Sequence, residues 1–151
     1  PIVSGSEVFF TTGYERGCAL LDLSGASPSK VYENKSLCSH FGSPVLIDGY
    51  IYGVNGNTGG GQLICLDLKT GTEKWKQNVG FASLIAIGDK LLVLNEKGML
   101  FVADASPAGY KEVAAGPSGI GGTCWTSPVF CRGMIYCRNS AGDLVALDVS
   151  K

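Results

Sequence analysis

The chain has 151 residues, of which 45% are hydrophobic and 17% are charged, and its formal net charge at pH 7 is −1. This length and composition fit one globular domain with a real core and exclude a disordered chain. The charges form no basic or acidic block, and no apolar run approaches the ~20 residues of a membrane span. We therefore expect neither nucleic-acid binding nor a transmembrane segment.

Glycine accounts for 22 of the residues, about twice its usual share of ~7%. Gly and Pro interrupt the chain so often that only residues 29–41 form a long stretch without either. Helices usually need about 8–20 uninterrupted residues. The sequence therefore predicts an all-β protein.

The first predicted strands lie in residues 1–10, where two apolar runs flank a tight Ser-Gly-Ser turn. The same arrangement returns at residues 44–53, 84–93 and 128–137. A glycine-led apolar run that contains a recurring aspartate follows each pair, at residues 17–23, 61–68, 98–105 and 142–149. The recurring aspartates are Asp22, Asp67, Asp104 and Asp148. Two motifs that share one period of about 42 residues indicate four copies of one structural unit.

Each unit is interpreted as strands A, B, C and D, with the aspartate at the end of strand C. The clearest strand D lies in residues 69–78, where Thr70 and Gly71 form the turn and Trp75 lies on the strand. Strands A and B are apolar on both faces, whereas a half-exposed sheet would alternate apolar and polar residues. Sheets buried on both sides and joined by short turns are typical of a β-propeller. A β-sandwich or a flat solenoid is the alternative.

The units predict a single partial propeller over residues 1–151, built from four antiparallel blades of up to four strands each. The expected blades span approximately residues 1–42, 43–82, 83–126 and 127–151. The fourth unit ends directly after strand C, so its outer strand is missing and 15 strands are expected in all.

Residues 61–75 carry the pattern G-x-L-x-C-L-D followed by x-x-T-G-x-x-x-W. This pattern resembles the repeat of PQQ-like β-propellers, a family that includes quinoprotein alcohol dehydrogenases and the non-enzymatic scaffold of outer-membrane protein assembly. Units one and four match strands A to C, whereas unit three is degenerate and has no tryptophan. The tail from Cys124 to Lys151 is similar to the C-termini of uncharacterised bacterial members.

The resemblance implies a parent propeller of seven or eight blades, of which this chain is the C-terminal half. It implies a periplasmic or secreted setting, with the remaining blades of the parent as structural partners. It also implies that Trp75 docks one blade on the next, so this side chain should be buried between sheets. The other motif residues have local roles: Gly61 and Gly71 supply turn geometry, and Asp67 caps the turn that follows it.

No catalytic pattern is present. Quinoprotein dehydrogenases hold PQQ between a tryptophan and a vicinal Cys-Cys pair, with calcium on Glu and Asn and an Asp as base. The chain has no Cys-Cys pair, and none of those residues could be matched by position. The single histidine, His40, limits any histidine-based triad or metal site. We therefore expect no catalytic residue, no cofactor and no metal in this chain, and the question whether it is an enzyme leans towards no.

The leading functional hypothesis is a non-catalytic binding or scaffold module that acts through its loops and channel mouth. The alternative is the C-terminal portion of a PQQ-dependent alcohol dehydrogenase, with PQQ and calcium as cofactors. The candidate binding residues precede the Ser-Pro pairs at 43–44 and 127–128, where the chain enters innermost strands. They are Cys38, His40, Phe41, Cys124, Trp125 and Thr126.

These segments should surround one mouth of the central channel, so we expect a polar and aromatic rim for a protein, peptide or glycan. A packed plug between blades is the alternative for the same residues. A zinc site from Cys38, His40 and Cys124 is a weaker hypothesis. Most of the six cysteines are expected to be small buried hydrophobes. Cys131 and Cys137 flank a predicted two-residue turn and should point to opposite faces of the sheet, so we expect no bond between them.

Overall fold

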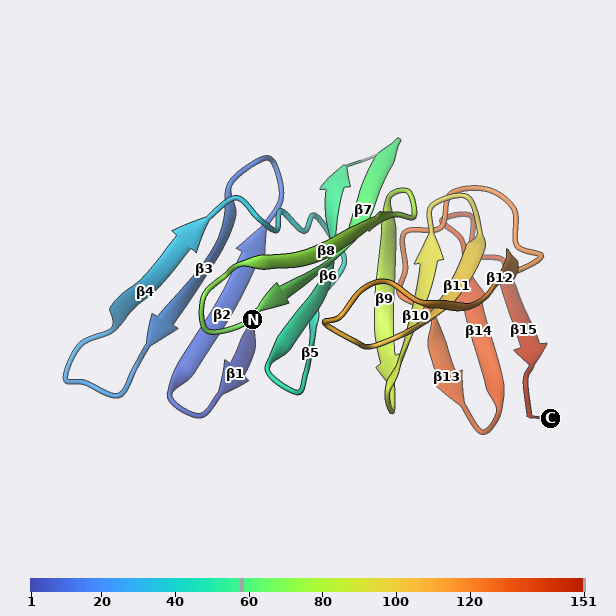
Figure 1. Ribbon diagram of the computed structural model, residues 1–151. Helices are drawn as coiled ribbons and strands as arrows, with labels where there is room; N and C mark the ends of the chain where they lie inside the picture. The colour runs from blue at the N-terminus through green and yellow to red at the C-terminus, as the bar shows by residue number, and fades with distance from the viewer. Residues whose placement is uncertain (58, 151) are drawn as a thin grey trace.

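The structure is a computed structural model that describes residues 1–57 and 59–150, and these residues form 15 strands and no helix. The strands group into three four-stranded sheets and one three-stranded sheet, all antiparallel, each built from strands consecutive in sequence (Figure 1). We call these sheets blades 1 to 4. The predicted all-β propeller architecture and the predicted 15 strands are confirmed.

Blade 1 contains β1 (Ile2–Ser4), β2 (Glu7–Thr12), β3 (Gly17–Asp22) and β4 (Ser29–Asn34). Blade 2 contains β5 (Val45–Ile47), β6 (Tyr50–Asn57), β7 (Gly60–Asp67) and β8 (Glu73–Asn78). Blade 3 contains β9 (Ala82–Ile87), β10 (Lys90–Asn95), β11 (Met99–Asp104) and β12 (Glu112–Pro117). Blade 4 contains β13 (Val129–Cys131), β14 (Met134–Arg138) and β15 (Leu144–Asp148).

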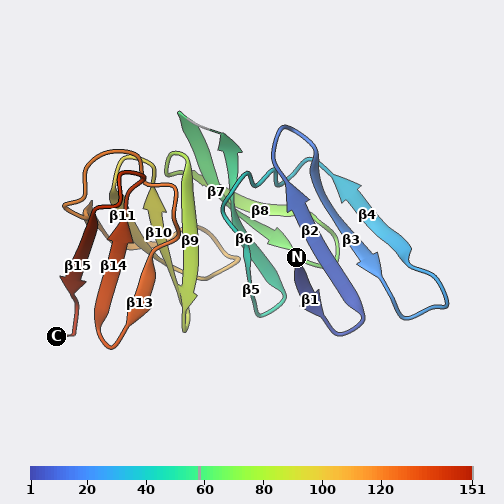
Figure 2. The ribbon, with the colours of Figure 1, turned by 180° about the vertical axis from the view of Figure 1, so that it is seen from behind.

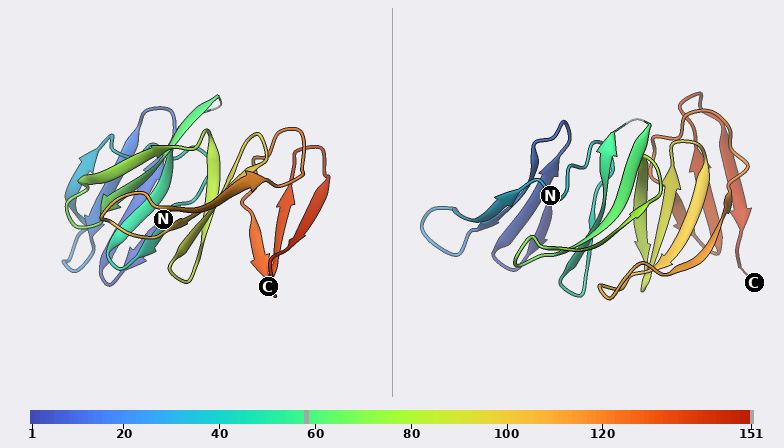
Figure 3. Two further views of the ribbon diagram at one scale, coloured as in Figure 1. Left: turned by 45° about the vertical axis from the view of Figure 1, so that its right-hand side comes forward. Right: turned by 45° about the horizontal axis from the view of Figure 1, so that its top comes forward.

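The four blades stand side by side in chain order and form an open row, with the two ends of the chain in the outermost blades (Figure 2). The views from other directions show the same succession of sheets (Figure 3). In every blade, the turn between the second and third strands lies at the same end of the strands, at the top of Figure 1. The connections from one blade to the next lie at this end too. We call it the upper face, and we call the opposite end of the strands, where the remaining turns lie, the lower face.

The hydrophobic core is divided among the seams between neighbouring blades. The two middle strands of blade 2 send alternate side chains to opposite seams: Ile51 and Ile64 pack on blade 1, whereas Tyr52 and Leu63 pack on blade 3. Blade 3 repeats this division towards blades 2 and 4. A strand whose two faces both meet a neighbouring sheet must be apolar at successive positions, which explains the continuous apolar runs of strands A and B.

The outer faces of the first and last blades have no neighbouring sheet. On blade 1 the side chains of Val3 and Phe10 are 70% and 40% exposed, and on blade 4 those of Val129 and Leu144 are 55% and 63% exposed. Single exposed apolar residues are common on protein surfaces. Phe10 and Leu144 correspond in the repeat to Gly53 and Leu63, which are buried at the inner seams, so the two end faces have the character of uncovered blade interfaces.

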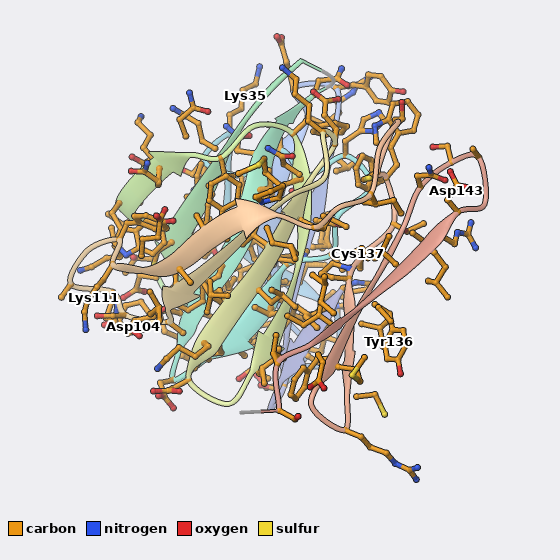
Figure 4. The ribbon with its side chains drawn as sticks, turned by 90° about the vertical axis from the view of Figure 1, so that its right-hand side faces the viewer. Lys35, Asp104, Lys111, Tyr136, Cys137 and Asp143 are labelled. Atoms are coloured by element: carbon orange, nitrogen blue, oxygen red, sulfur yellow. The ribbon has the colours of Figure 1, made fainter. Side chains whose placement is uncertain are left out.

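The last hairpin has the predicted register, with Cys131 opposite Met134. Arg132 and Gly133 between them have φ values of 51° and 76°, as a two-residue turn with two left-handed positions requires. Cys131 is exposed and Cys137 is buried, so the predicted opposite orientation of the two side chains is confirmed. Cys137 is a residue of β14, and its side chain is buried in the interior (Figure 4). None of the six cysteines, all of which the structure describes, forms a disulfide.

Candidate functional site

The recurring aspartates end the third strand of each blade and lie at the lower face. The Oδ1 atom of Asp67 accepts hydrogen bonds from the backbone N–H groups of Lys69 and Thr70, at 2.9 and 3.0 Å. Asp22 accepts in the same way from Ser24 at 2.9 Å, and Asp148 accepts from Ser150 at 3.0 Å. These carboxylates hold their own turns, which is the Asx-type role expected for Asp67.

Asp104, in the degenerate third unit, has a different role. Its carboxylate pairs with Lys90 at 3.1 Å and with Lys111 at 2.8 Å, and Figure 4 shows Asp104 and Lys111 together at the lower face. The hydrogen bonds and charges of these two lysines lower the pKa of Asp104. Unit three therefore replaces a hydrogen-bonded turn by an ion-paired one and still forms the same four-stranded sheet.

Trp75 links blade 2 to blade 3, as the family resemblance implied. Its Nε1 atom donates a hydrogen bond to the backbone oxygen of Ser106 at 2.7 Å. Its ring lies 6.0 Å from the ring of Tyr52 and 5.9 Å from that of Tyr110. The side chain is only half-buried rather than fully buried. The reason is its position on β8, the outer strand of its sheet, where one side remains open to solvent.

Gly61 does not belong to a turn, which corrects the expectation from sequence. It lies inside β7, and its backbone oxygen accepts from the N–H groups of Val79 and Gly80 at 3.3 and 3.1 Å. A Cβ atom at this position would lie 2.6 Å from the backbone oxygen of Gly80. Glycine is needed here because the connection to blade 3 passes directly over the strand. Gly71 does occupy a turn, with a φ of 67°, and the hydroxyl of the neighbouring Thr70 contacts that of Thr72.

The upper face carries a row of aromatic rings. Phe41 lies 4.5 Å from Phe81 and 5.9 Å from Trp125, measured between ring centroids. His40 lies 5.8 Å from Phe81 and 4.6 Å from Tyr14. These side chains come from the first turn of blade 1 at this face and from the three connections between blades. The structure thus brings His40, Phe41 and Trp125 into one aromatic row, which we define as Tyr14, His40, Phe41, Phe81 and Trp125.

The rings of the row differ in exposure. Tyr14 is 75% exposed and Trp125 is 46% exposed, whereas Phe81 is only 2% exposed. His40 is exposed and Phe41 is half-buried. Phe81 therefore forms a buried base against which the more accessible rings pack. The row is thus packed at Phe81 and open at its ends, and both the binding rim and the packed plug stay predictions for these residues.

Phe81 and Tyr14 are members of the row that the sequence reasoning missed. A signal for Phe81 was present: an aromatic residue stands two positions before Ser43, Ser83 and Ser127 in turn, as Phe41, Phe81 and Trp125. Tyr14 had no comparable signal. It is placed by a turn in which Tyr14 and Glu15 have φ values of 55° and 59°, a left-handed conformation that side chains other than glycine rarely adopt.

The other candidate residues do not join the row. Cys124 is fully buried and packs with Cys137 in the core between blades 3 and 4. The hydroxyl of Thr126 donates to the backbone oxygen of Arg138 at 2.9 Å. The backbone N–H of Cys38 donates to Oδ1 of Asn55 at 2.8 Å. These three residues thus help to attach the connections to the blades.

The described residues contain no group of three His, Cys, Asp or Glu side chains that could hold a metal ion. The zinc hypothesis does not fit, because the side chain of Cys124 is in an apolar core while His40 is exposed. Burial also raises the pKa of the buried thiols: it raises that of Cys65 to about 11 and shifts those of Cys18, Cys124 and Cys137 in the same direction. These thiols remain protonated near neutral pH and are poor nucleophiles or metal ligands.

The residues present do not fit the PQQ and calcium site that the alternative function would need. The family resemblance implies that such a site has a vicinal cysteine pair, which the sequence lacks, and calcium on Glu and Asn with an Asp as base. The recurring carboxylates are at the lower face and are committed to their own turns or to lysines. We therefore derive no reaction step through these cofactors.

A hollow of about 410 Å³ lies beside the aromatic row at the seam between blades 1 and 2. Its walls come from the β2–β3 turn, from the first connection between blades and from the upper end of β6. The lining residues are Tyr14, Glu15, Lys35, Cys38, Asn55, Gly56 and Asn57. Figure 4 shows Lys35 at this upper end, opposite Asp104 and Lys111. Its volume is within the range of about 300–1,000 Å³ that is usual for ligand pockets.

Comparison with known proteins supplies the family. A family model described as outer membrane protein assembly factor BamB matches residues 1–77. A search of curated proteins finds no match to this sequence. In none of the described residues is there a helix long and apolar enough to cross a membrane.

Solved structures share the fold at low sequence identity. BamB from Moraxella catarrhalis has a TM-score of 0.75 and 13% identity, covering 97% of this chain and 41% of that chain. A europium-containing methanol dehydrogenase has a TM-score of 0.68 and 15% identity, covering 98% of this chain and 39% of that chain. A chain from a nidogen/laminin complex has a TM-score of 0.65 and 13% identity, covering 97% of this chain and 57% of that chain. The chain therefore spans well under two thirds of the length of these structures.

Proposed function

The chain belongs to the family of PQQ-like β-propeller repeat proteins, whose matching model is described as outer membrane protein assembly factor BamB, and on this premise we propose that it is a non-catalytic scaffold module that binds a protein partner. The partner contacts the upper face. Family membership by itself supports a propeller scaffold and leaves the binding surface open, because one fold supports many functions.

The aromatic row is the observation that carries this proposal. Protein interfaces are enriched in tyrosine, tryptophan and phenylalanine, and a few such anchors provide most of the binding energy. Trp125 and Tyr14 are large side chains that remain 46% and 75% exposed, although each has a ring neighbour that fixes its position. Such rings lose little side-chain entropy when a partner covers them.

The uncovered end faces support a second element of the proposal, which is that further blades complete the propeller. The chain covers 41% of the BamB structure that it resembles, and its first and last blades expose Val3, Phe10, Val129 and Leu144. Further blades would bury these side chains in the way that the inner seams bury theirs. The family likeness also supports a periplasmic or secreted location for the complete protein.

A PQQ-dependent oxidoreductase is the second candidate, favoured by the likeness to a methanol dehydrogenase at a TM-score of 0.68. Its test is direct. PQQ absorbance in the purified natural protein, together with dye-linked oxidation of alcohols, would favour the enzyme over the scaffold. The scaffold proposal expects neither signal.

Site-specific photo-crosslinking tests the scaffold proposal. A benzoylphenylalanine side chain is placed at Trp125 on the upper face and, in a matched variant, at Arg132 on the lower face, and both proteins are irradiated in cells at natural chain length. We expect position 125 to give a discrete adduct with one protein and position 132 to give none. Equal adducts from both positions, or none from position 125, would overturn the proposal.

A further inference from the structure

The hollow of about 410 Å³ between blades 1 and 2 lies beside the aromatic row, and hydrogen bonds hold two of its walls together. Gly56 donates its N–H to the backbone oxygen of Cys38 at 3.3 Å, and Cys38 donates its N–H to Oδ1 of Asn55 at 2.8 Å. The first connection between blades is thereby attached to the upper end of β6. The hollow is thus preformed, which reduces the entropy that binding must overcome.

The turn above the hollow is held in a strained conformation. Tyr14 and Glu15 both have positive φ values, and a left-handed conformation costs about 1–2 kcal/mol for each residue that is not glycine. The turn is closed by a hydrogen bond from Arg16 N–H to the Gly13 oxygen at 3.2 Å. The edge-to-face contact between Tyr14 and His40 also holds this turn against the first connection between blades. Residues held in such conformations cluster at binding sites, and here the strain places an exposed ring and a carboxylate beside the hollow.

The chemistry of the lining favours a ligand that is uncharged overall and rich in amide groups. Lys35 and Glu15 contribute one charge of each sign, and neither forms an ion pair within the described part of the chain. The two charges balance, so a phosphate or another polyanion has no excess of positive charge to attract it. Asn55 uses Oδ1 to accept from Cys38, and the structure gives its Nδ2 donor no bond within residues 1–57 and 59–150. This donor is suited to a carbonyl oxygen.

The spacing of the aromatic row favours an extended chain. An extended polypeptide rises about 3.3 Å per residue, so alternate side chains on one side recur every ~6.6 Å. Neighbouring rings in the row are separated by 4.6 Å between Tyr14 and His40 and by 5.8 Å between His40 and Phe81. The last step, from Phe81 to Trp125, is 6.5 Å. The steps of 5.8 and 6.5 Å come close to this repeat, whereas Tyr14 and His40 form a closer pair. The row also crosses three connections, which is more than one sugar ring could cover.

We propose that the hollow and the aromatic row together bind an extended, overall neutral polypeptide segment with apolar side chains at alternate positions. The backbone of the segment occupies the hollow, where Asn55 donates to a carbonyl oxygen. Its apolar side chains pack on the accessible rings of the row, from Tyr14 and His40 at one end to Trp125 at the other. This inference rests on the proposed function and adds to it the chemical class of the ligand and the direction in which it lies.

Selection from a phage-displayed library of random dodecapeptides tests the inference on the protein at its natural chain length. The decisive variant is Tyr14→Gly, which removes the ring and relieves the left-handed strain. Its matched control is Arg132→Gly, which relieves the same strain at the lower face, where Arg132 has a φ of 51°. Both variants should stay close to the natural protein in stability, because relief of the left-handed strain offsets the extra chain entropy of glycine in the unfolded state, and urea unfolding of both variants checks this. Folding failure therefore cannot mimic a loss of binding.

We expect selected peptides to carry apolar residues at alternate positions. They should bind Tyr14→Gly about tenfold more weakly than the natural protein, a difference of about 1.4 kcal/mol. They should bind Arg132→Gly within about twofold of the natural protein, because the lower face takes no part. In the same titration, maltohexaose and chitohexaose should not compete with the peptides.

Three results would overturn the inference: no enriched peptide, peptides that bind Tyr14→Gly as tightly as the natural protein, or saturable binding of either oligosaccharide in place of peptide. The proposed function has its own readout in the adduct from position 125. If position 125 gives an adduct but Tyr14→Gly does not weaken peptide binding, the proposed function stands and only the inference about the hollow is wrong. If the adduct is missing as well, both the proposed function and the inference are wrong.

Discussion

The upper and lower faces of the same blades use their polar and aromatic groups in opposite ways. At the lower face, Asp67 is bonded to its own turn, and Trp75 is bonded to Ser106 of the next blade. At the upper face, Trp125 and Tyr14 make ring contacts and remain 46% and 75% exposed. Both faces are built by the same antiparallel topology, so the difference lies in the side chains and not in the fold.

This difference explains why the most regular feature of the sequence carries the least information about function. The aspartates, the turn glycine Gly71 and Trp75 recur or match a motif because turns and blade seams need them. The exposed rings of the aromatic row are free of that requirement and can vary with the ligand. In a repeat protein of this kind, residues that hydrogen-bond or pack with one another build the repeat. Exposed residues that lie outside the motif are the candidates for binding.

The two tryptophans give the strongest test of the difference. Trp75→Ala removes the ring contacts with Tyr52 and Tyr110 and the hydrogen bond to Ser106. We expect it to lower the free energy of unfolding by about 2–3 kcal/mol, less than a fully buried tryptophan would. Trp125→Ala should lower it by at most about 1 kcal/mol, because the side chain is 46% exposed. Urea unfolding of both variants measures the two values, and equal losses would break the distinction between the faces.

Substitution of the turn aspartates should have a smaller effect on the free energy of unfolding. The comparison is between Asp67 of a regular unit and Asp104 of the degenerate one. Asp67→Ala removes the acceptor for two backbone N–H groups, and we expect a loss of about 1 kcal/mol in the free energy of unfolding that salt hardly changes. Asp104→Ala removes two ion pairs that are partly open to solvent. Its effect should be smaller and should shrink further at 1 M salt, because exposed ion pairs are screened. Unfolding measured at low and high salt checks both statements, and a salt-dependent loss at Asp67 would contradict the first.

The smallest expected effect is a loss of stability of the lower face in acid. Hydrogen bonds from Ser24 lower the pKa of Asp22, and hydrogen bonds from Ser150 lower that of Asp148. A carboxyl group whose pKa is lower in the folded state stabilises the fold above its unfolded pKa of about 3.9 and loses this contribution as the pH falls below it. The double variant with Asp22→Asn and Asp148→Asn should therefore lose less stability than the natural protein between pH 5 and pH 2. Unfolding at a series of pH values measures this, and identical pH profiles would refute it.

Much of the fold could be predicted from the sequence because the blade pattern is local and repeated. The apolar runs of strands A and B, the aspartate at the end of strand C and the Arg132–Gly133 turn each depend on neighbouring residues. The role of Gly61 was predicted wrongly because the need for glycine at this position does not come from neighbouring residues. It is needed where a distant part of the chain, at Gly80, passes over the strand, and a turn glycine looks the same in sequence.

The candidate site was predicted only in part, for the same physical reason. His40, Phe41 and Trp125 were found because they precede Ser-Pro pairs that enter innermost strands. Cys124 lies in an equivalent segment, yet its side chain turns into the core, and the choice between core and surface depends on how neighbouring blades pack. Tyr14 could not be predicted, because the left-handed turn that presents it has no glycine at that position to indicate such a conformation.

The most direct test of the whole account measures binding and stability together for one residue of each face. Trp125→Ala and Asp67→Ala are compared in affinity for the protein captured from position 125 and in free energy of unfolding, under conditions where both variants are folded. The account predicts that Trp125→Ala weakens binding by about tenfold or more with little loss of stability, while Asp67→Ala loses about 1 kcal/mol of stability and binds normally. If Asp67→Ala weakened binding as much as Trp125→Ala, the assignment of binding to the upper face would be wrong.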